Sequence, residues 1–385
     1  MAALLTLVAL VMSSACVSNE QDREAADKGA RSVADALRSG DTSGFARAYT
    51  ARKFVFPVDH GPHPDYKHEW WYVTGNLRAE TGRHFGFQLT FFRFGLKPEI
   101  AKRASSWATN QLYMAHFTLS DVAAKKFHHF ERFSRGAAGL AGAQATPLRV
   151  WLEDWFLEGR VGEPAEAMPS LRLYARSDDI AIDLVGASAK PIVLHGEGGL
   201  SRKSATPGNA SYYYSATRLR TKGLVQIGKQ RFTVEGLSWL DREWATSALD
   251  GDQIGWDWFA LQLADGYELM FYRLRMRDGS AHAFSRGTLV APDGSVRQLA
   301  PDDVQLEVRD YWTSARTGTR YPSRWQLGIL DYDMRLQIEP YLADQELDVS
   351  VRYWEGAVKV TGTRSNLPVR GHGYVELVGY AQRTK

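Results

Sequence analysis

Two carboxylates and a guanidinium stand between tryptophans in the segment from Ser238 to Trp244, which reads Ser-Trp-Leu-Asp-Arg-Glu-Trp. Charged groups in so apolar a setting must be paired, because burying an unpaired charge is strongly unfavourable. One interpretation is structural: a buried ion pair that closes a β-barrel. The other is functional: a polar patch in an apolar cavity, where Asp241 or Glu243 acts as general acid or base or orients the polar end of a ligand. The sequence leaves both interpretations open.

Two further segments repeat this combination of aromatic and acidic side chains. Trp256-Asp257-Trp258 follows closely in the sequence, and Tyr353-Trp354-Glu355 belongs to a strand that we expect to face the same interior. Aromatic walls with a few polar groups are typical of small-molecule sites. The predicted ligand-binding residues are Trp70, Trp71, Arg242, Trp244, Trp256, Asp257, Trp258, Tyr353 and Glu355, beside the candidate catalytic residues Asp241 and Glu243.

Signatures of the common enzyme classes are missing from the sequence. No Walker-type or dinucleotide-type glycine loop follows a predicted strand. The segment Gly236-Leu237-Ser238-Trp239-Leu240 lacks the final glycine of a nucleophile elbow. We therefore find no hydrolase triad and no support for serine hydrolysis.

A group of histidines and acids precedes the first predicted strand. Its spacing matches no familiar metal motif, and Pro62 and Pro64 indicate an extended entry into the strand, where such side chains close loop hydrogen bonds. We expect no metal and no cofactor. The residues concerned are His60, His63 and His68 with Asp59, Asp65 and Glu69.

The elements that must position these residues are antiparallel strands. From Phe54 onward apolar and polar residues alternate, and Gly, Asn and Asp interrupt the chain at short intervals. One hairpin begins at Trp71 and turns at Ala79-Glu80-Thr81-Gly82. Its return strand has alternating apolar residues at Phe85, Phe87, Leu89 and Phe91.

A second hairpin has the same order of tryptophans, turn and return strand. It begins at Trp256, turns at Ala264-Asp265-Gly266 and returns through Phe271. This likeness suggests an internal duplication, although strand-rich chains can also look alike by chance. No segment with helical periodicity is of comparable strength. Many short strands separated by turns predict an all-β fold of sandwiches or barrels, which protect strand edges from aggregation.

Length and composition favour two domains. The chain has 385 residues, beyond the size at which a single core usually stops growing. Lys and Arg (47) nearly balance Asp and Glu (44), and no run of like charge suits nucleic acid. With 12 Trp, 17 Tyr and 17 Phe, the aromatic content suits sheets and apolar cavities. We place the first domain at residues 53–220 and the second at 221–385.

The N-terminal region resembles a bacterial lipoprotein signal. An apolar run from Ala2 to Met12 precedes Ser13-Ser14-Ala15, and Cys16 is the only cysteine. We expect residues 1–15 to be removed and Cys16 to carry lipid, with a plain secretory signal or a buried thiol as alternatives. By resemblance to bacterial sorting rules, Val17 favours the outer membrane. Residues 16–52 are expected to form a partly helical tether, with a disordered stalk as the alternative for the first half.

Five ordered segments resemble the AttH-like, lipocalin-like proteins, a superfamily that also contains the bacterial carotenoid hydratases. The resemblance implies two lipocalin-like antiparallel β-barrels in tandem. It also implies export, and an association with ABC-type export permeases; some members are named predicted secreted hydrolases. The segments are HPDYKHEWWYVTGNL (63–77), SWLDREW (238–244), GWDWFALQLADGYELMFYRLR (255–275), YWEGAVKVTG (353–362) and GHGYVELVGY (371–380).

The resemblance to the hydratases departs from their pattern at one position. Their Asp-His-Asn-Trp segment supplies a histidine and a tryptophan that protonate a carbon–carbon double bond, helped by a downstream Tyr and Asp. Here Arg242 stands at the histidine position and cannot shuttle a proton. Tyr272 lies where the downstream tyrosine is expected, which makes it a third catalytic candidate, but Leu274 stands where a carboxylate is expected. Carotenoid hydration is therefore not expected.

The sequence leads to two main hypotheses from different classes, with a purely structural partner of a membrane complex as a third possibility. In the first, the chain is an envelope lipoprotein on the periplasmic face of the outer membrane. It binds an apolar or amphipathic ligand such as a lipid or isoprenoid, beside an ABC-type export system. In the second, it is an enzyme of the hydratase, isomerase or cyclase type that uses acid–base chemistry on such a molecule.

Overall fold

The computed structural model describes residues 41–99, 105–161, 168–247 and 249–381. The predicted signal peptide, Cys16 and most of the predicted tether lie outside these residues. Residues 41–52, the described part of the tether, contain no helix. Three short 3₁₀ turns, η1 (Val58–His60), η2 (Pro301–Asp303) and η3 (Leu330–Tyr332), are the helical elements of the described chain, and none is long and apolar enough to cross a membrane. The predicted all-β class is confirmed.

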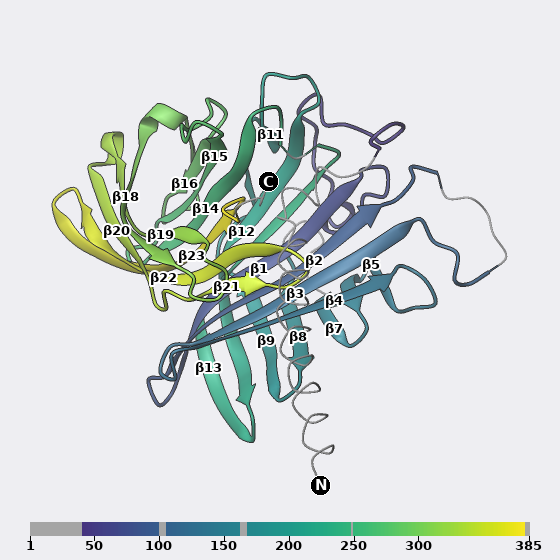
Figure 1. The fold of residues 1–385 in the computed structure, drawn as a ribbon, viewed down its shortest axis with the longest axis horizontal. Helices are drawn as coiled ribbons and strands as arrows, with labels where there is room; N and C mark the ends of the chain where they lie inside the picture. The colour runs from purple at the N-terminus through teal and green to yellow at the C-terminus, as the bar shows by residue number, and fades with distance from the viewer. Residues whose placement is uncertain (1–40, 100–104, 162–167, 248, 382–385) are drawn as a thin grey trace, which may run out of the picture.

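The first sheet contains 13 antiparallel strands and curls into a nearly closed barrel (Figure 1). Its path runs β4-β3-β2-β1-β13-β12-β9-β8-β7-β6-β5, with β10 and β11 paired to β12. Contacts of β6 with β2, β3 and β4 bring the two ends of the path together. The strands are β1 (His68–Ala79), β2 (His84–Gly95), β3 (Gln111–Asp121), β4 (Lys126–Arg135), β5 (Ala141–Ala145), β6 (Leu148–Leu152), β7 (Trp155–Gly159), β8 (Leu171–Ser177), β9 (Ile180–Ser188), β10 (Val193–Leu194), β11 (Leu200–Arg202), β12 (Ala210–Ile227) and β13 (Gln230–Ala245).

The second sheet contains 10 strands and curls in the same way into a half-barrel. Its path runs β17-β16-β15-β14-β23-β22-β20-β19-β18, with β21 paired to β22. The two-barrel fold expected from strand texture is thus confirmed. The strands are β14 (Gln253–Leu263), β15 (Glu268–Met276), β16 (Arg286–Val290), β17 (Val296–Leu299), β18 (Val304–Thr313), β19 (Arg320–Ile329), β20 (Met334–Pro340), β21 (Glu346–Asp348), β22 (Arg352–Arg364) and β23 (Leu367–Val378).

Both predicted hairpins form, and their turns have the expected glycines. Gly82 (φ +83°) ends the turn between β1 and β2, and Gly266 (φ +89°) ends the turn between β14 and β15. A positive φ is readily adopted only by residues without a Cβ. The predicted alternation on β2 also holds, because Phe85, Phe87, Leu89 and Phe91 all lie in the core of the first barrel.

The domain boundary predicted at residue 220 is wrong, because that position falls inside β12. β12 pairs with β9 and β13, and β13 pairs with β1, so all four belong to the first sheet. The first sheet ends at Ala245 and the second begins at Gln253. β13 is the second neighbour that β1 needs for its backbone hydrogen bonds. Local sequence patterns do not reveal such a long-range pairing.

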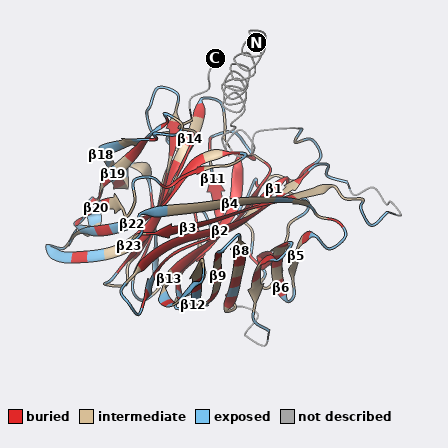
Figure 2. Ribbon diagram, turned by 60° about the horizontal axis from the view of Figure 1, so that its bottom comes forward, coloured by how far each residue is buried: buried red, intermediate tan, exposed pale blue. Residues whose placement is uncertain are grey.

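A third apolar cluster lies between the two sheets. It joins aromatic residues of β1, β12 and β13 to aromatic residues of β14, β15 and β23, and further contacts link β1 with β23 and β2 with β22. The strands at this junction are mostly buried, whereas the ends of β22 and β23 that project beyond it carry exposed residues (Figure 2). The two barrels therefore pack through sheet faces, and each of these central strands has one face toward its own barrel and one toward the other domain.

Candidate active site between the two sheets

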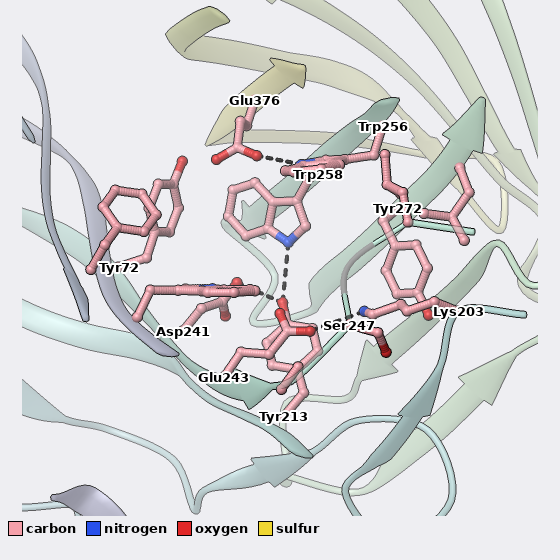
Figure 3. Close-up of a pocket in the computed structure, with 15 residues that line it drawn as sticks. Tyr72, Lys203, Tyr213, Asp241, Glu243, Ser247, Trp256, Trp258, Tyr272 and Glu376 are labelled. Atoms are coloured by element: carbon pink, nitrogen blue, oxygen red, sulfur yellow. Dashed lines mark hydrogen bonds and ion pairs between the residues drawn. The ribbon is translucent and has the colours of Figure 1, made fainter. Parts of the chain in front are cut away.

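A pocket of about 90 Å³ opens within this junction (Figure 3). That volume holds several water molecules or the reactive part of a small ligand. Both sheets contribute to its wall, and aromatic rings surround a few polar groups. The lining residues are Trp70, Tyr72, Phe92, Lys203, Tyr213, Asp241, Glu243, Ala245, Ser247, Leu249, Trp256, Trp258, Tyr272, Leu274 and Glu376.

The alternation of β13 divides the charged motif between two compartments. Asp241 and Glu243 point into the pocket, and Trp239 on the same face of β13 belongs to the inter-sheet cluster. Arg242 and Trp244 point the opposite way, toward the core of the first barrel. Neighbouring residues of a strand must face opposite sides, so the two carboxylates cannot share a site with the guanidinium between them.

Asp241 is held by three donors and is almost fully buried, with 4% of its surface exposed. The hydroxyl of Tyr213 donates to Oδ2 at 2.5 Å, and the indole of Trp239 donates to Oδ1 at 2.5 Å. Ser215 also donates to Oδ1. Burial raises the pKa of Asp241 to about 7, against the effect of these hydrogen bonds, and the charge of Glu243 adds to the rise. A substantial fraction of Asp241 is therefore protonated near neutral pH.

Glu243 forms a buried ion pair with Lys203, the only cation among the described residues that line the pocket. The ammonium of Lys203 lies 3.0 Å from Oε1 of Glu243, and Ser211 donates a second hydrogen bond to the same oxygen. Burial lowers the pKa of Lys203, but Glu243, Tyr272 and Asp241 together outweigh burial and the net shift is upward. Lys203 also lies 4.4 Å from the centre of the Tyr272 ring. Glu243 is thus the ion-paired carboxyl of the pocket.

Glu376 of β23 enters the pocket from the second sheet, across from Asp241 (Figure 3). Trp256 donates its indole hydrogen to this carboxyl. Burial raises the pKa of Glu376 to about 7, and the charges of Asp241 and Glu243 add to the rise. Glu355 lies opposite Glu376 on β22 and receives a hydrogen bond from Tyr72 at 2.8 Å; burial and the charge of Glu376 hold its pKa well above the usual range.

The pocket contains more carboxyl groups than cations, which favours protonation of some of these carboxyls. Three carboxyl groups line it, Asp241, Glu243 and Glu376, and Lys203 compensates one of them. Carboxyls that are close together and poorly solvated cannot all ionise near neutral pH. The pocket therefore offers an acidic proton next to flat aromatic surfaces, which is the arrangement that general acid catalysis on an apolar substrate requires.

Six of the predicted site residues meet in this pocket. They come from β1, β13, β14 and β15, and Trp258 lies at the centre of the group, where its indole donates to Tyr213 at 3.1 Å. The hydroxyl of Tyr272 makes a 3.0 Å hydrogen bond with Ser201. The six residues are Asp241, Glu243, Tyr272, Trp70, Trp256 and Trp258.

Three other predicted ligand-binding residues, Trp71, Arg242 and Trp244, lie inside the first barrel instead. Arg242 is fully buried, stacks 3.9 Å above the Trp71 ring and forms an ion pair with Glu69. Arg93 pairs with the other oxygen of Glu69. The two guanidinium groups lower the pKa of Glu69 despite its burial. The contacts of Arg242 therefore support the structural interpretation, a buried ion pair.

Asp257, Tyr353 and Glu355 lie near the pocket without lining it. Asp257 points toward the second barrel, where it pairs with Arg273 at 2.6 Å and Arg275 at 3.0 Å. Glu355 and Tyr353 lie behind Glu376, on the inter-sheet side of β22. Their influence on the pocket is indirect, through the charge and position of Glu376.

His63 and Asp59, which precede β1, form a hydrogen-bonded cluster with Glu69 of β1 in the first barrel. His63 contacts Asp59 at 3.0 Å and Glu69 at 3.3 Å, and it stacks on Trp244 at 3.8 Å between ring centres. Arg52 pairs with Asp59 at 2.6 Å. Among the described residues no group of His, Cys, Asp and Glu has an arrangement that could hold a metal ion.

Sequence reasoning missed five polar residues that line the pocket, Tyr72, Lys203, Tyr213, Ser247 and Glu376. Glu376 is a lone acid in an apolar strand, inside the segment Gly371 to Tyr380, and that isolation was the available signal. Tyr213 is hidden in a run of three tyrosines. Lys203 follows β11 in a polar segment without strand alternation, yet its side chain is only 13% exposed. Its burial follows from the packing of the second sheet, which local sequence does not encode.

Comparison with known proteins identifies relatives over most of the chain. The model of the AttH-like family matches residues 47–380. The crystal structure of an AttH-type protein from Nitrosomonas europaea is 36% identical, with a TM-score of 0.76 over 87% of this chain and 100% of that chain. Kievitone hydratase from Fusarium solani subsp. phaseoli is 25% identical over 244 residues, which is 61% of this chain and 67% of that protein. The structure of kievitone hydratase from Nectria haematococca has the same fold, with a TM-score of 0.65 at 16% identity over 89% and 98% of the two chains.

Proposed function

The chain belongs to the AttH-like family, and from this premise we propose that it is a hydratase-type enzyme that adds water to a carbon–carbon double bond of an apolar small molecule. The observation that carries the proposal is the carboxyl of Asp241, whose pKa lies at about 7 in an aromatic pocket. An acid whose pKa is close to the working pH is well suited to proton transfer. The 25% identical relative is named a hydratase, which supports the same reaction class.

In the proposed reaction, Asp241 donates its proton to one carbon of the double bond. The other carbon becomes electron-deficient, and the π faces of Trp256 and Trp258 with the carboxylate of Glu243 stabilise the positive charge. Water then adds to this carbon and gives a proton to Glu376 on the opposite wall. The sum is one water added across one double bond, with Asp241 deprotonated and Glu376 protonated at the end.

The test uses water labelled with ¹⁸O and the purified protein. Alkene probes, 4-vinylphenol and linear isoprenoid alkenes, are incubated with the enzyme, and label in the alcohol product is measured by mass spectrometry. The Asp241→Asn variant is expected to lower kcat by about 10²- to 10⁴-fold, the usual contribution of a general acid, with little change in KM. Asp183→Asn is the matched control, because Asp183 is 39% exposed in a surface ion pair.

Two outcomes would contradict the enzymatic proposal. If wild-type protein binds a probe by calorimetry but never incorporates label, a binding protein for apolar or amphipathic ligands is the better description. If Asp241→Asn turns over as fast as wild type, Asp241 is not the acid. A Glu376→Gln variant separates the roles further, because it is expected to slow turnover while leaving the binding of the alkene in place.

We also propose, from the sequence alone, that the chain is exported and anchored by lipid at Cys16 on the outer membrane. This proposal rests on the apolar run that is followed by Ser13-Ser14-Ala15-Cys16. In a bacterial host, the Cys16→Ser variant is expected to lose incorporation of labelled palmitate and to leave the membrane fraction, whereas Ser18→Ala is expected to keep both. An ABC-type export permease as partner stays a prediction.

A further inference from the structure

Two glutamates from neighbouring strands lie side by side at the rear of the pocket. Glu355 of β22 and Glu376 of β23 stand directly opposite each other in the register of the two strands. Residues in that relation point to the same face of a sheet, with Cβ atoms about 4.5–5.5 Å apart. This separation allows their carboxyl groups to hydrogen-bond to each other. Glu376 lines the pocket (Figure 3), whereas Glu355 behind it is fully buried.

One carboxyl oxygen of Glu355 has a hydrogen-bond donor and the other has none. The hydroxyl of Tyr72 donates to Oε2 at 2.8 Å. Oε1 is buried and accepts no hydrogen bond from a donor of the described residues. A buried carboxylate oxygen without a donor is unfavourable. The cost disappears if Glu355 is a neutral carboxylic acid, because Oε1 then carries the proton and donates it in a hydrogen bond to the carboxylate of Glu376.

The surroundings of the two carboxyls favour this arrangement. Burial and the negative charge of Glu376 hold the pKa of Glu355 well above its usual range, so Glu355 keeps its proton near neutral pH. Burial also raises the pKa of Glu376, to about 7, although hydrogen bonds from Trp256 and Glu355 act in the opposite direction. Glu376 is therefore the member of the pair that ionises first. Above neutral pH the two carboxyls together hold one proton and one negative charge.

The other titratable groups near the pair do not neutralise its charge. Asp241 and Glu243 of β13 face Glu376 across the pocket, and their charges add to the rise in its pKa. Lys203, the cation of the pocket, pairs with Glu243. A second negative charge on the pair would therefore be uncompensated. Burial raises the pKa of the surrounding tyrosines well above the usual value, so they stay neutral. The further titratable groups around the pair are Tyr72 of β1, His116 of β3, Glu131 of β4, Tyr353 of β22 and Tyr374 of β23.

We propose that Glu355 is a positioning residue that shares one proton with Glu376 and thereby keeps Glu376 ionised and ready to accept a proton from water. The proposal deepens the proposed function and rests on it for its purpose. During hydration one O–H bond of the water breaks, its oxygen bonds to the electron-deficient carbon, and the proton passes to Glu376. Glu355 keeps its own proton throughout. The pair is then neutral, and Asp241, which gave its proton to the substrate, carries the negative charge that the pair has lost.

The first test measures protonation in the purified protein without any ligand. Glutamate is labelled with ¹³C at the side-chain carboxyl, and the Glu355→Gln and Glu376→Gln variants assign the two signals. An ordinary glutamate has a pKa of about 4.3 and is ionised at about pH 8. At that pH we expect Glu355 to have the chemical shift of a protonated carboxyl and Glu376 that of a carboxylate. Glu376 is expected to become protonated in a step with its midpoint at about pH 7.

Two substitutions of Glu355 distinguish a hydrogen-bond donor from a charge. Glu355→Gln retains a donor, the amide N–H, so the midpoint of Glu376 is expected to stay close to that of the wild type. Glu355→Met has a similar size but no donor, so the midpoint is expected to rise. If Glu355 were ionised in the wild type, both variants would remove a repelling charge and lower the midpoint, which would overturn the proposal. Glu158→Gln, in a surface pair with Arg149, is the matched control and is expected to leave the midpoint unchanged.

The second test is the pH dependence of ¹⁸O incorporation. Because hydration needs Glu376 in its ionised form, kcat is expected to fall on the low-pH side with the midpoint that NMR gives for Glu376. Glu355→Met is expected to move this fall to higher pH and to lower kcat at about pH 7 by about 10- to 100-fold, the effect of losing a hydrogen bond to a charged group. Glu355→Gln is expected to recover most of that loss. A residue that only supported the fold would change kcat without moving its pH dependence.

The two measurements distinguish failure of the shared proton from failure of the reaction. The proposal is overturned if Glu355 has the shift of a carboxylate at about pH 8, or if the Met and Gln variants give Glu376 the same midpoint. Should one variant of Glu355 fail to fold, the shift of Glu355 in the wild type still decides, because Glu376→Gln also assigns the signals. Failure of the proposed function shows as wild-type protein without ¹⁸O incorporation at any pH, while the NMR result on the pair stands by itself.

Discussion

The protonated state of Asp241 depends on a conflict between burial and hydrogen bonding at a single carboxyl. Tyr213, Ser215 and Trp239 favour the ionised form, and burial among apolar rings opposes it more strongly. A carboxyl that accepts three hydrogen bonds and still has a raised pKa is unusual on a protein surface. Such conflicts are typical of functional sites, where a group is held in a state that its own stability does not favour.

The raised pKa of Asp241 predicts how stability varies with pH. Between about pH 4 and 7 the native state holds a proton on Asp241 that the unfolded chain has released, so stability is present at low pH and falls as pH rises through this window. The fall in the free energy of unfolding that this single group causes is on the order of a few kcal/mol. For Asp241→Asn, the free energies of unfolding in urea at about pH 5 and pH 8 are expected to differ less than for the wild type.

The quantity compared is the slope of the unfolding free energy against pH, because replacing the carboxyl by an amide can also change stability by the same amount at every pH. Asp183→Asn serves as the control and is expected to keep the wild-type slope, since Asp183 is in an exposed ion pair. An unchanged slope in Asp241→Asn would show that Asp241 is already ionised in the native protein below neutral pH. That result would also remove the acid from the proposed reaction.

Arg242 is expected to act on stability and not on the chemistry of the pocket. Its guanidinium is fully buried against Glu69 and Trp71, on the barrel side of β13. Arg242→Ala is expected to lower the free energy of unfolding by about 3–5 kcal/mol, as for other broken buried pairs. Arg309→Ala, in a pair whose arginine is 52% exposed, is expected to cost less than about 0.5 kcal/mol. Denaturant unfolding measures both.

A substitution by histidine tests whether position 242 takes part in the chemistry, as the resemblance to the hydratases would imply. Arg242→His places a titratable ring at the position where those enzymes are expected to have one. Because this position faces the first barrel, the variant is expected to gain no ¹⁸O incorporation. Increased turnover in Arg242→His would contradict the division of β13 into a pocket face and a barrel face.

At the scale of elements, the junction depends on two sheet faces that approach closely. Gly86 of β2 faces Ala357 of β22, and a Cβ built on Gly86 would lie 2.3 Å from the Cβ of Ala357. Carbon atoms do not pack at that distance, so the sheets must separate to accept any side chain there. The glycine is therefore required by the packing of the two domains and not by its backbone conformation.

Gly86→Ala is expected to destabilise the protein by about 1–3 kcal/mol, the usual range for overpacking. Gly328→Ala on β19 is the matched control, because its new Cβ would meet neighbours only at 3.8 Å. We expect that variant to be neutral or slightly stabilising, since glycine weakens a strand interior. Thermal unfolding of the two variants gives the comparison. Equal effects would indicate that the sheets do not approach each other as closely as described.

At the scale of the whole molecule, the contacts between the two barrels predict that they unfold as one cooperative unit. Lys190 and Arg218 of the first domain both pair with Glu268 of β15, which is fully buried, and the Lys190 distance is 2.6 Å. The pocket and this ion cluster both need residues from both domains. The pocket therefore exists only when the domains are docked, and ligand binding is expected to stabilise the docked form.

Glu268→Ala tests this cooperativity. The substitution leaves two buried cations without their carboxylate, and we expect a loss of about 3–5 kcal/mol. Calorimetry is expected to show one unfolding transition for the wild type and a lower, broadened or divided transition for the variant. Glu307→Ala, in a surface pair where Glu307 is 60% exposed, is the control. If wild type already unfolds in two steps, the domains are independent and the cooperative description is wrong.

Local sequence patterns were sufficient to predict most of the strands, the two hairpins and the family. Alternation and turn glycines are local properties, which is why the return strand from Phe85 to Phe91 and the turns at Gly82 and Gly266 were predictable. Local spacing also brings Asp241 and Glu243 to one face of a strand. The same rule of alternation, applied to Arg242, would have separated it from them.

Which strands pair across the sequence, and which sheet faces pack together, can be read only from the tertiary structure. The pairing of β1 with β13 moved the domain boundary, and the docking of the sheets brought Lys203 and Glu376 to Asp241. These contacts join residues far apart in the chain, and their geometry depends on how two curled sheets pack. The raised pKa of Asp241 follows from that packing, because desolvation is a property of the surroundings and not of the segment that contains the acid.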